Sequence, residues 1–198
     1  MGPRLRPGSA VRAWVVGHDG FRVGVALLAV GLAVSVYAFV RVPSPYGGPI
    51  PMWFLTPPAL ATLSALSVRN EIPVVGWADR RLRRARLGWA LAVTALTGAC
   101  AALVGANAGQ DRLPELTMTL TGLTFGAAVA VGRGSAALGA ACLVAVVGST
   151  VALHDLTPAR IWDHLAWPGQ TAAAIVCAVA VTAYARFGAP GSAGGLSG

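Results

Sequence analysis

The chain has 198 residues, of which 56% are hydrophobic and 11% are charged, and its mean hydropathy is +0.67. A soluble globular domain has about 25% charged residues, so this composition excludes an ordinary water-soluble fold. The net charge of +8 comes from fifteen basic residues, all of them Arg. In so apolar a chain we expect this charge to set membrane topology, and we expect no nucleic-acid partner.

Long apolar runs follow one another along the chain and predict an all-α, polytopic membrane protein. A helix of about 20 residues crosses roughly 30 Å of hydrocarbon. Six runs predict spans near residues 23–40, 50–68, 87–106, 116–131, 136–153 and 172–184. We expect residues 1–188 to form a single transmembrane bundle and the Gly/Ser-rich tail 189–198 to be disordered.

The second expected span contains two adjacent prolines, Pro57 and Pro58, and follows a Pro/Gly turn over residues 43–49. In a soluble helix such a pair would end the helix. In a bundle, neighbouring helices and Thr56 can satisfy the freed carbonyl groups. We therefore expect a kinked span.

The loop after the second span is strongly basic and amphipathic. Its pattern predicts a short helix within residues 70–86 that lies along the cytoplasmic membrane surface. Such a helix could couple the protein to a cytoplasmic ATPase subunit, through Glu71, Trp77, Arg80, Arg81 and Arg84. The alternative is an arginine cluster that fixes topology and binds anionic membrane lipids.

The fourth expected span carries hydroxyl and small residues near one face. Thr117, Thr121 and Thr124 follow at i, i+4 and i+7, and Gly122 and Gly126 form a GxxxG pattern close to them. Small residues let helix backbones approach and threonines can bond across, so helix packing is the default explanation. The same face could instead line a substrate path. Thr94 and Thr97 of the third span, together with Gly98, could face these residues.

The loop before the last span predicts a second short helix, over residues 157–167 on the outside. Thr157 and Pro158 form a helix start, and Trp162 and Trp167 are typical of the membrane interface. Two His and two Asp nearby invite comparison with a metal site, but their spacing matches no zinc motif. We expect an interfacial loop without metal. The four residues are His154, Asp155, Asp163 and His164.

The placement of the arginines predicts the orientation. With a cytoplasmic N-terminus, six spans leave twelve arginines on the cytoplasmic side and three outside, at Arg41, Arg112 and Arg160. Basic residues are retained on the cytoplasmic side. We therefore expect a multi-pass protein of the plasma membrane with both ends in the cytoplasm.

Catalytic motifs are absent from the sequence. No GxSxG elbow, DxxD-rich metal cluster or Walker loop occurs, so we expect neither enzyme activity nor a cofactor in this chain. No ionisable residue lies at the middle of an expected span, which argues against a proton-coupled carrier or an ion pump. If ATP drives the function, another chain binds the ATP.

In this order the features resemble a type-2 ABC exporter permease, in particular the small permease-like membrane subunits of actinobacterial ABC systems. The resemblance depends on six spans, the basic segment 70–86, the stretch 120–124 and the segment 162–168. It implies a homo- or hetero-dimer with a second permease, a cytoplasmic ATPase for each half, and export of a hydrophobic or peptide-like substrate. The alternative is a non-transporting membrane scaffold or immunity protein. A lipid-modifying enzyme would require the His and Asp residues of the outside loop to converge.

Overall fold

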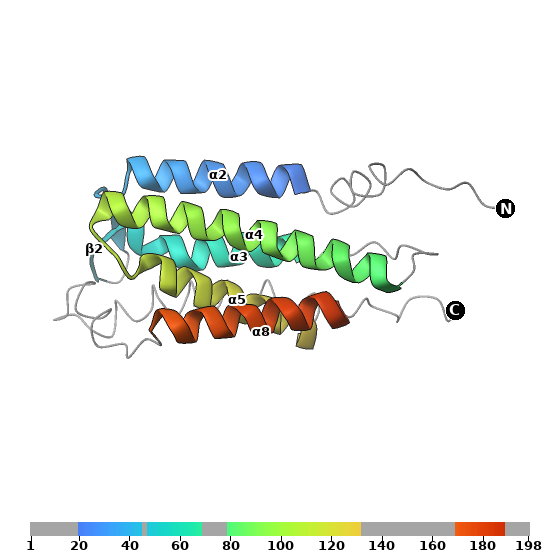
Figure 1. Ribbon diagram of the computed structural model, residues 1–198. Coiled ribbons are helices and arrows are strands. Elements are labelled where there is room, and N and C mark those ends of the chain that lie inside the picture. The colour runs from blue at the N-terminus through green and yellow to red at the C-terminus, as the bar shows by residue number, and fades with distance from the viewer. Residues whose placement is uncertain (1–19, 45–46, 69–78, 132–168, 189–198) are drawn as a thin grey trace, which may run out of the picture.

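The computed structural model describes residues 20–44, 47–68, 79–131 and 169–188 (Figure 1). These residues form five α-helices and one small β-hairpin, so the all-α prediction is confirmed for this part of the chain. The helices are α2 (Gly20–Val36), α3 (Thr56–Val68), α4 (Asp79–Ala108), α5 (Leu113–Val131) and α8 (Gln170–Phe187).

Two of the described helical segments are long and apolar enough to cross a membrane. They are Arg83–Ala108 and Gln170–Phe187, and Phe21–Val36 is a shorter apolar helix. The expected span 136–153, the expected helix 157–167 and the tail 189–198 lie outside the described residues. The described helices thus include two membrane-crossing candidates, where the sequence predicted six spans in the whole chain.

The five helices lie side by side along one axis (Figure 1). Helix α4 contacts each of the other four helices, while α5 packs mainly against α8 and α3. Helices α2 and α4 run in one direction, whereas α3, α5 and α8 run in the other (Figure 1). Consequently α5 and α8 end at the same end of the bundle.

A hairpin covers the other end of the bundle, where the sequence predicted only a turn. Strand β1 (Arg41–Ser44) pairs antiparallel with β2 (Gly47–Pro51), and the 3-10 helix η1 (Met52–Leu55) follows directly. Trp53 and Phe54 of η1 are buried against α2, α4 and α5. This small cluster holds the hairpin against the bundle end.

Helix α3 starts later than the sequence predicted, and the expected kink is wrong. Pro57 and Pro58 are the second and third residues of α3. The N–H groups of a helix's first turn have no acceptor within the helix, so proline costs little there and its fixed φ favours helix initiation. The prolines therefore begin a helix of 13 residues.

The separate surface helix expected within residues 70–86 is also wrong for residues 79–86. They form the first two turns of α4, which continues without a break for 30 residues. From Asp79 to Arg86 the chain contains Arg, Leu and Ala but no Gly or Pro, and extending an existing helix is far easier than starting one. The rest of the expected helix, residues 70–78, lies outside the described residues.

Large apolar side chains are exposed on the bundle exterior, and several hydroxyl residues are buried within it. Large apolar side chains are exposed along one side of α2, at Phe21, Val25, Leu28, Leu32 and Val36. In the most apolar 18-residue stretch of each long helical segment, only 39% is buried for Arg83–Ala108 and 33% for Gln170–Phe187. Several hydroxyl residues are fully buried instead, namely Thr56, Ser64, Ser67, Thr97, Thr117 and Thr121. Such an exterior is compatible with contact with lipid.

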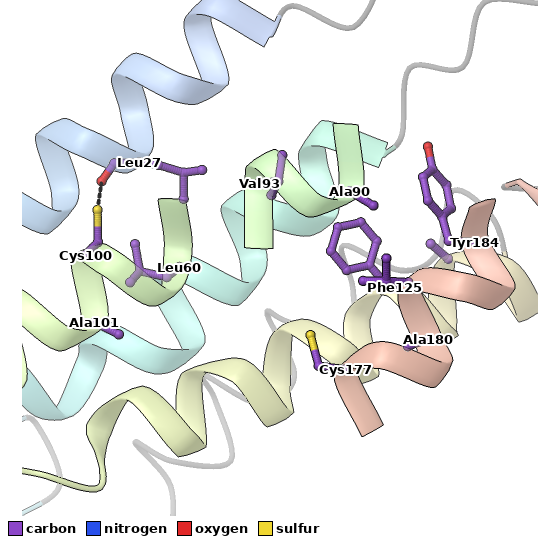
Figure 2. Close-up of a cluster of buried hydrophobic side chains, with 12 residues drawn as sticks. Leu27, Leu60, Ala90, Val93, Cys100, Ala101, Phe125, Cys177, Ala180 and Tyr184 are labelled. Atoms are coloured by element: carbon purple, nitrogen blue, oxygen red, sulfur yellow. Dashed lines mark hydrogen bonds between the residues drawn. The ribbon is translucent and has the colours of Figure 1, made fainter. Parts of the chain in front are cut away.

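The main core cluster draws residues from all five helices (Figure 2). Its largest members are Phe125 of α5 and Tyr184 of α8, whose ring centroids lie 5.5 Å apart at an interplanar angle of 42°. Much of the remainder is small, including Ala90, Ala101 and Cys177. Small residues allow the helices to pack closely around the two rings.

Candidate functional site

Acidic and basic side chains of the described residues lie only at the two ends of the bundle. One end carries Arg and no acidic side chain among those that the structure describes; we call it the basic end. Its members are Arg22, Arg83, Arg84, Arg86 and Arg186. The opposite end is balanced, with Arg41 and Arg112 against Asp111 and Glu115. The net positive charge of the described side chains is therefore concentrated at the basic end.

The length of α4 presents part of the basic end to solvent. Figure 1 shows α4 extending past the start of α2 at this end. The segment from Asp79 to Arg86 adds about 12 Å of helix ahead of the apolar part. Arg83 and Arg84 on this extension are exposed, whereas Arg86 is half-buried.

Arg86 connects α4 to the end of α8. Its guanidinium group lies against Gly188, whose φ is +68°. The Gly188 N–H donates to the carbonyl of Tyr184 at 2.8 Å and closes the last turn of α8. Carbonyl groups at a helix C-terminus carry partial negative charge and attract a cation. A side chain at position 188 would overlap the guanidinium and would strain the backbone, so this junction requires glycine.

The residues predicted to couple to a partner are only partly described. Arg84 is exposed on the second turn of α4. Arg80 and Arg81 belong to the first turn of the same helix, although their side chains lie outside the described part of the structure. Glu71 and Trp77 lie outside the described residues. The described members of this set therefore share one rigid helix.

The three threonines predicted to line one face of α5 are all buried. Two of them bond to their own helix: Thr117 Oγ1 donates to Leu113 O at 2.8 Å, and Thr124 Oγ1 donates to Thr121 O at 2.8 Å. No hydrogen-bond partner is recorded for the buried Thr121 hydroxyl. The bonded hydroxyls are thus satisfied within α5, and among the described residues they form no hydrogen bond to another helix.

The two glycines of the GxxxG pattern have different surroundings. A Cβ atom on Gly122 would lie 3.0 Å from Cys177 Cα and 3.1 Å from Cys177 N. The backbones of α5 and α8 therefore approach closely here. A Cβ on Gly126 would meet nothing within 4 Å. Of the two glycines, Gly122 is the one at which the structure places close packing.

Helix α3 contributes polar contacts that the sequence analysis missed. Of the α4 residues predicted to be able to face α5, Gly98 does so, since a Cβ there would lie 3.2 Å from Met118 Sδ. The hydroxyl of Thr97 instead lies 3.1 Å from that of Ser64 in α3. Each hydroxyl also lies within hydrogen-bond distance of a carbonyl in its own helix, Val93 O and Leu60 O respectively. Since a hydroxyl has one proton, at most one of the two can donate across the seam, and that hydroxyl then does not donate to its own helix carbonyl. The spacing of the hydroxyl residues within the apolar sequence of α3 could have indicated this contact.

A further interhelical hydrogen bond joins Asn107 and Ser35. The amide Nδ2 of Asn107 in α4 donates to Ser35 Oγ in α2.

Among the described residues, no group of three or more His, Cys, Asp or Glu is placed to hold a metal. The histidines and aspartates of segment 154–164 lie outside those residues. The described geometry therefore supplies packing contacts and a basic end.

Comparisons with protein-family models, with curated proteins and with solved structures give no match to this chain. Its function is therefore inferred from its own residues.

Proposed function

We propose that this chain is the membrane subunit of an ABC-type exporter and that a separate cytoplasmic ATPase docks at its basic end. The observation that carries the proposal is the difference between the two bundle ends, combined with an apolar exterior between them. Arginine concentrated at one end is the distribution that retains this end in the cytoplasm. An apolar exterior is what lipid-facing helices require.

The directions of the helices support six crossings. Helix α5 ends at Val131 at the basic end, and α8 begins at Gln170 at the opposite end (Figure 1). In the proposed topology, the apolar run 136–153 makes the intervening crossing. Both chain termini then lie on the cytoplasmic side of the plasma membrane, together with the basic end.

The extension of α4 supports a coupling role for this end. A movement of a docked ATPase would be transmitted directly, because the residues that meet it and the apolar part of α4 share one continuous helix. In the proposed contact, Arg80, Arg81 and Arg84 face the ATPase together with Glu71 and Trp77, which precede α4 in the sequence. At other protein interfaces, removing one partner of a desolvated ion pair typically weakens binding by about 2–5 kcal/mol.

The proposed substrate is hydrophobic or peptide-like, and its path lies between this subunit and a second permease. The close approach at Gly122 leaves no space for a substrate between α5 and α8 at this level. The threonines beside it are buried, and two of the three bond within their own helix. A path between two subunits would leave these contacts intact.

Purification of the tagged full chain from its native membranes in mild detergent tests the proposal. The expected result is co-purification of an ATP-binding chain and Mg²⁺-dependent ATP hydrolysis. Arg80→Ala/Arg81→Ala is expected to lower recovery of that chain without affecting membrane insertion, whereas the matched Arg41→Ala/Arg112→Ala variant is expected to retain it. Absence of any ATP-binding chain from the purified complex would refute the exporter assignment.

Orientation can be tested independently with single cysteines in a variant that lacks the native ones. Cysteines at Gly47 and Gly169 are expected to react with a membrane-impermeant maleimide in intact cells. A cysteine at Asp79 is expected to react only after permeabilisation. Labelling at Asp79 in intact cells would overturn the orientation and with it the docking site.

A non-transporting membrane scaffold or immunity protein is the second candidate. The observation that favours it is the packing of the described interior, where small residues and self-bonded hydroxyls fill the helix contacts. Such a protein would insert and fold without an ATPase. The co-purification experiment separates the two candidates.

A further inference from the structure

One contact in the basic end joins two helix ends that are far apart in the sequence. The guanidinium group of Arg86, on the second turn of α4, lies so close to Gly188 that any side chain there would overlap it. Gly188 is buried and closes the last turn of α8 through its hydrogen bond to Tyr184 O. Arg86 therefore meets α8 at its C-terminal end, where the carbonyl groups carry partial negative charge.

The next turn of α4 contributes only a small side chain on the same side of the helix. Ala90 follows Arg86 by four residues, so both lie on one side of α4. Ala90 is fully buried in the main core cluster, which also contains Tyr184 (Figure 2). A methyl group allows close approach but forms no directional bond, whereas a guanidinium group has five N–H donors and a fixed charge. Of these two α4 residues, only Arg86 can hold α8 by charge.

Helix α8 is in turn held to α5 at two levels. The rings of Tyr184 and Phe125 have centroids 5.5 Å apart. About two turns earlier in α8, the backbone at Cys177 lies directly against Gly122 of α5. A displacement of the end of α8 would therefore be shared with α5.

We propose that Arg86 is a positioning residue whose charge locks the extension of α4 to the C-terminal end of α8, so that the two helix ends move together. The exposed Arg84 lies ahead of Arg86 in the same helix. The inference rests on the proposed function only where the docked ATPase supplies the movement. In that setting, a displacement of the α4 extension reaches α5 through α8 as well as through α4 itself.

Distances between spin labels in the purified full-length protein test the lock. In a variant without the native cysteines, one label pair joins α4 to α8, at Gly88→Cys and Thr182→Cys. A reference pair joins α4 to α2, at Gly88→Cys and Gly24→Cys. A Cβ atom meets nothing within 4 Å at either glycine, and Thr182 is exposed. Arg86→Met is expected to broaden the α4–α8 distance distribution and to shift it to longer distances, while the α4–α2 distribution stays unchanged.

Two further variants separate charge from packing. Arg86→Lys keeps a cation on a long apolar stem and should restore most of the narrow distribution, whereas Arg86→Met keeps only the stem. Arg186→Met removes the same charge from α8 itself, where the guanidinium carbon lies 5.6 Å from the centroid of the Phe187 ring, and should have no effect. The proposal is overturned if Arg86→Met has no effect, if Arg86→Lys broadens the distribution equally, or if Arg186→Met does.

Hydrogen exchange in the protein with its native cysteines provides an independent measurement. The last turn of α8 should exchange roughly tenfold faster in Arg86→Met, because a cation at a partly buried helix C-terminus stabilises that end by about this factor. The amides of α2 serve as the reference and should exchange as in the unmodified protein. Unchanged exchange at the end of α8 would also contradict the lock.

The outcome is separable from that of the exporter assignment, because Arg86 is not among the residues proposed to contact the ATPase. In a complex with the ATP-binding chain, labels at Gly24→Cys and Thr182→Cys should report a shift of α8 when a non-hydrolysable ATP analogue is added. Arg86→Met should reduce this shift, and a full shift in that variant would overturn the proposal. An unaltered α4–α8 distribution in Arg86→Met, with an ATP-binding chain recovered, would refute only the lock. A broadened distribution without an ATP-binding chain would refute only the exporter assignment.

Discussion

Residue size differs between two regions of the molecule. The seam between α5 and α8 contains small residues, whereas the outer side of α2 carries large ones. At the seam, Gly122 lets the backbone around Cys177 approach so closely that a single Cβ atom would crowd it. On the outer side of α2, Phe21, Leu28 and Leu32 are exposed. In water, large apolar residues gain most from burial, but in the membrane environment proposed for this chain the lipid tails are as apolar as leucine. Helix association in this environment depends on close packing of small residues, so small residues identify the contacts.

The largest predicted effect is at the seam itself. Gly122→Leu is expected to destabilise the protein by about 3 kcal/mol, because the new side chain meets helix backbone, which cannot rotate away. Thermal unfolding in detergent, followed by fluorescence-detected size exclusion, measures the change. The matched variant is Gly126→Leu, where a Cβ meets nothing within 4 Å. Similar losses in both variants would contradict the assignment of close packing to Gly122.

A second close contact joins α2 to α4. A Cβ on Gly31 would lie 2.6 Å from Cys100 Sγ and 2.8 Å from Cys100 Cβ. Gly31→Ala is therefore expected to cost about 2 kcal/mol. Because the obstacle is a side chain, adding Cys100→Gly should restore part of the loss, less about 1 kcal/mol for glycine within a helix. The same unfolding assay would count against this contact if the double variant were no more stable than Gly31→Ala.

The hydroxyl pair between α3 and α4 is expected to contribute less. Thr97→Val keeps the side-chain shape but removes the contact with Ser64, at an expected cost of about 0.6 kcal/mol, the average for hydrogen bonds between membrane helices. A double-mutant cycle with Ser64→Ala isolates this pair. A coupling energy of zero would show that each hydroxyl bonds only to its own helix.

The smallest effect is expected on the outer side of α2. Leu28→Ala and Leu32→Ala should each change stability in detergent by less than about 0.5 kcal/mol, because both side chains are exposed and leave no cavity. Insertion should also be unchanged, since the helix remains apolar. A loss above about 2 kcal/mol would mean that another protein surface covers this side of α2.

The positions of the long helices could be predicted from the sequence because apolar length alone determines them. The expected segments 87–106 and 172–184 lie within α4 and α8. The ends of the helices were harder to predict, because the local sequence there is compatible with two different structures. Pro57 and Pro58 are compatible with a kink or with a helix start, and only the neighbouring η1 decides between them. The arginines after Asp79 fit a surface helix as well as an extended α4.

Partners across the bundle could not be predicted from the sequence for a different reason. Helical periodicity assigns residues to a face but does not identify the helix opposite that face. Thr97 was predicted to face the threonines of α5, whereas its hydroxyl lies beside that of Ser64 in α3. The approach of Gly122 to Cys177 likewise joins segments far apart in the sequence. In the basic end, the contact of Arg86 with Gly188 depends on the same long-range arrangement.

The parallel pairing of α5 with α8 has a consequence for biogenesis. During synthesis, α5 is complete at Val131, but its partner is complete only at Phe187. At 5–20 residues per second, α5 waits for roughly 3–11 s. Throughout this interval the face around Gly122 lacks the helix that later covers it. A nascent chain stalled before Phe187 would present this face to proteases and chaperones, which could thereby distinguish incomplete chains from complete ones.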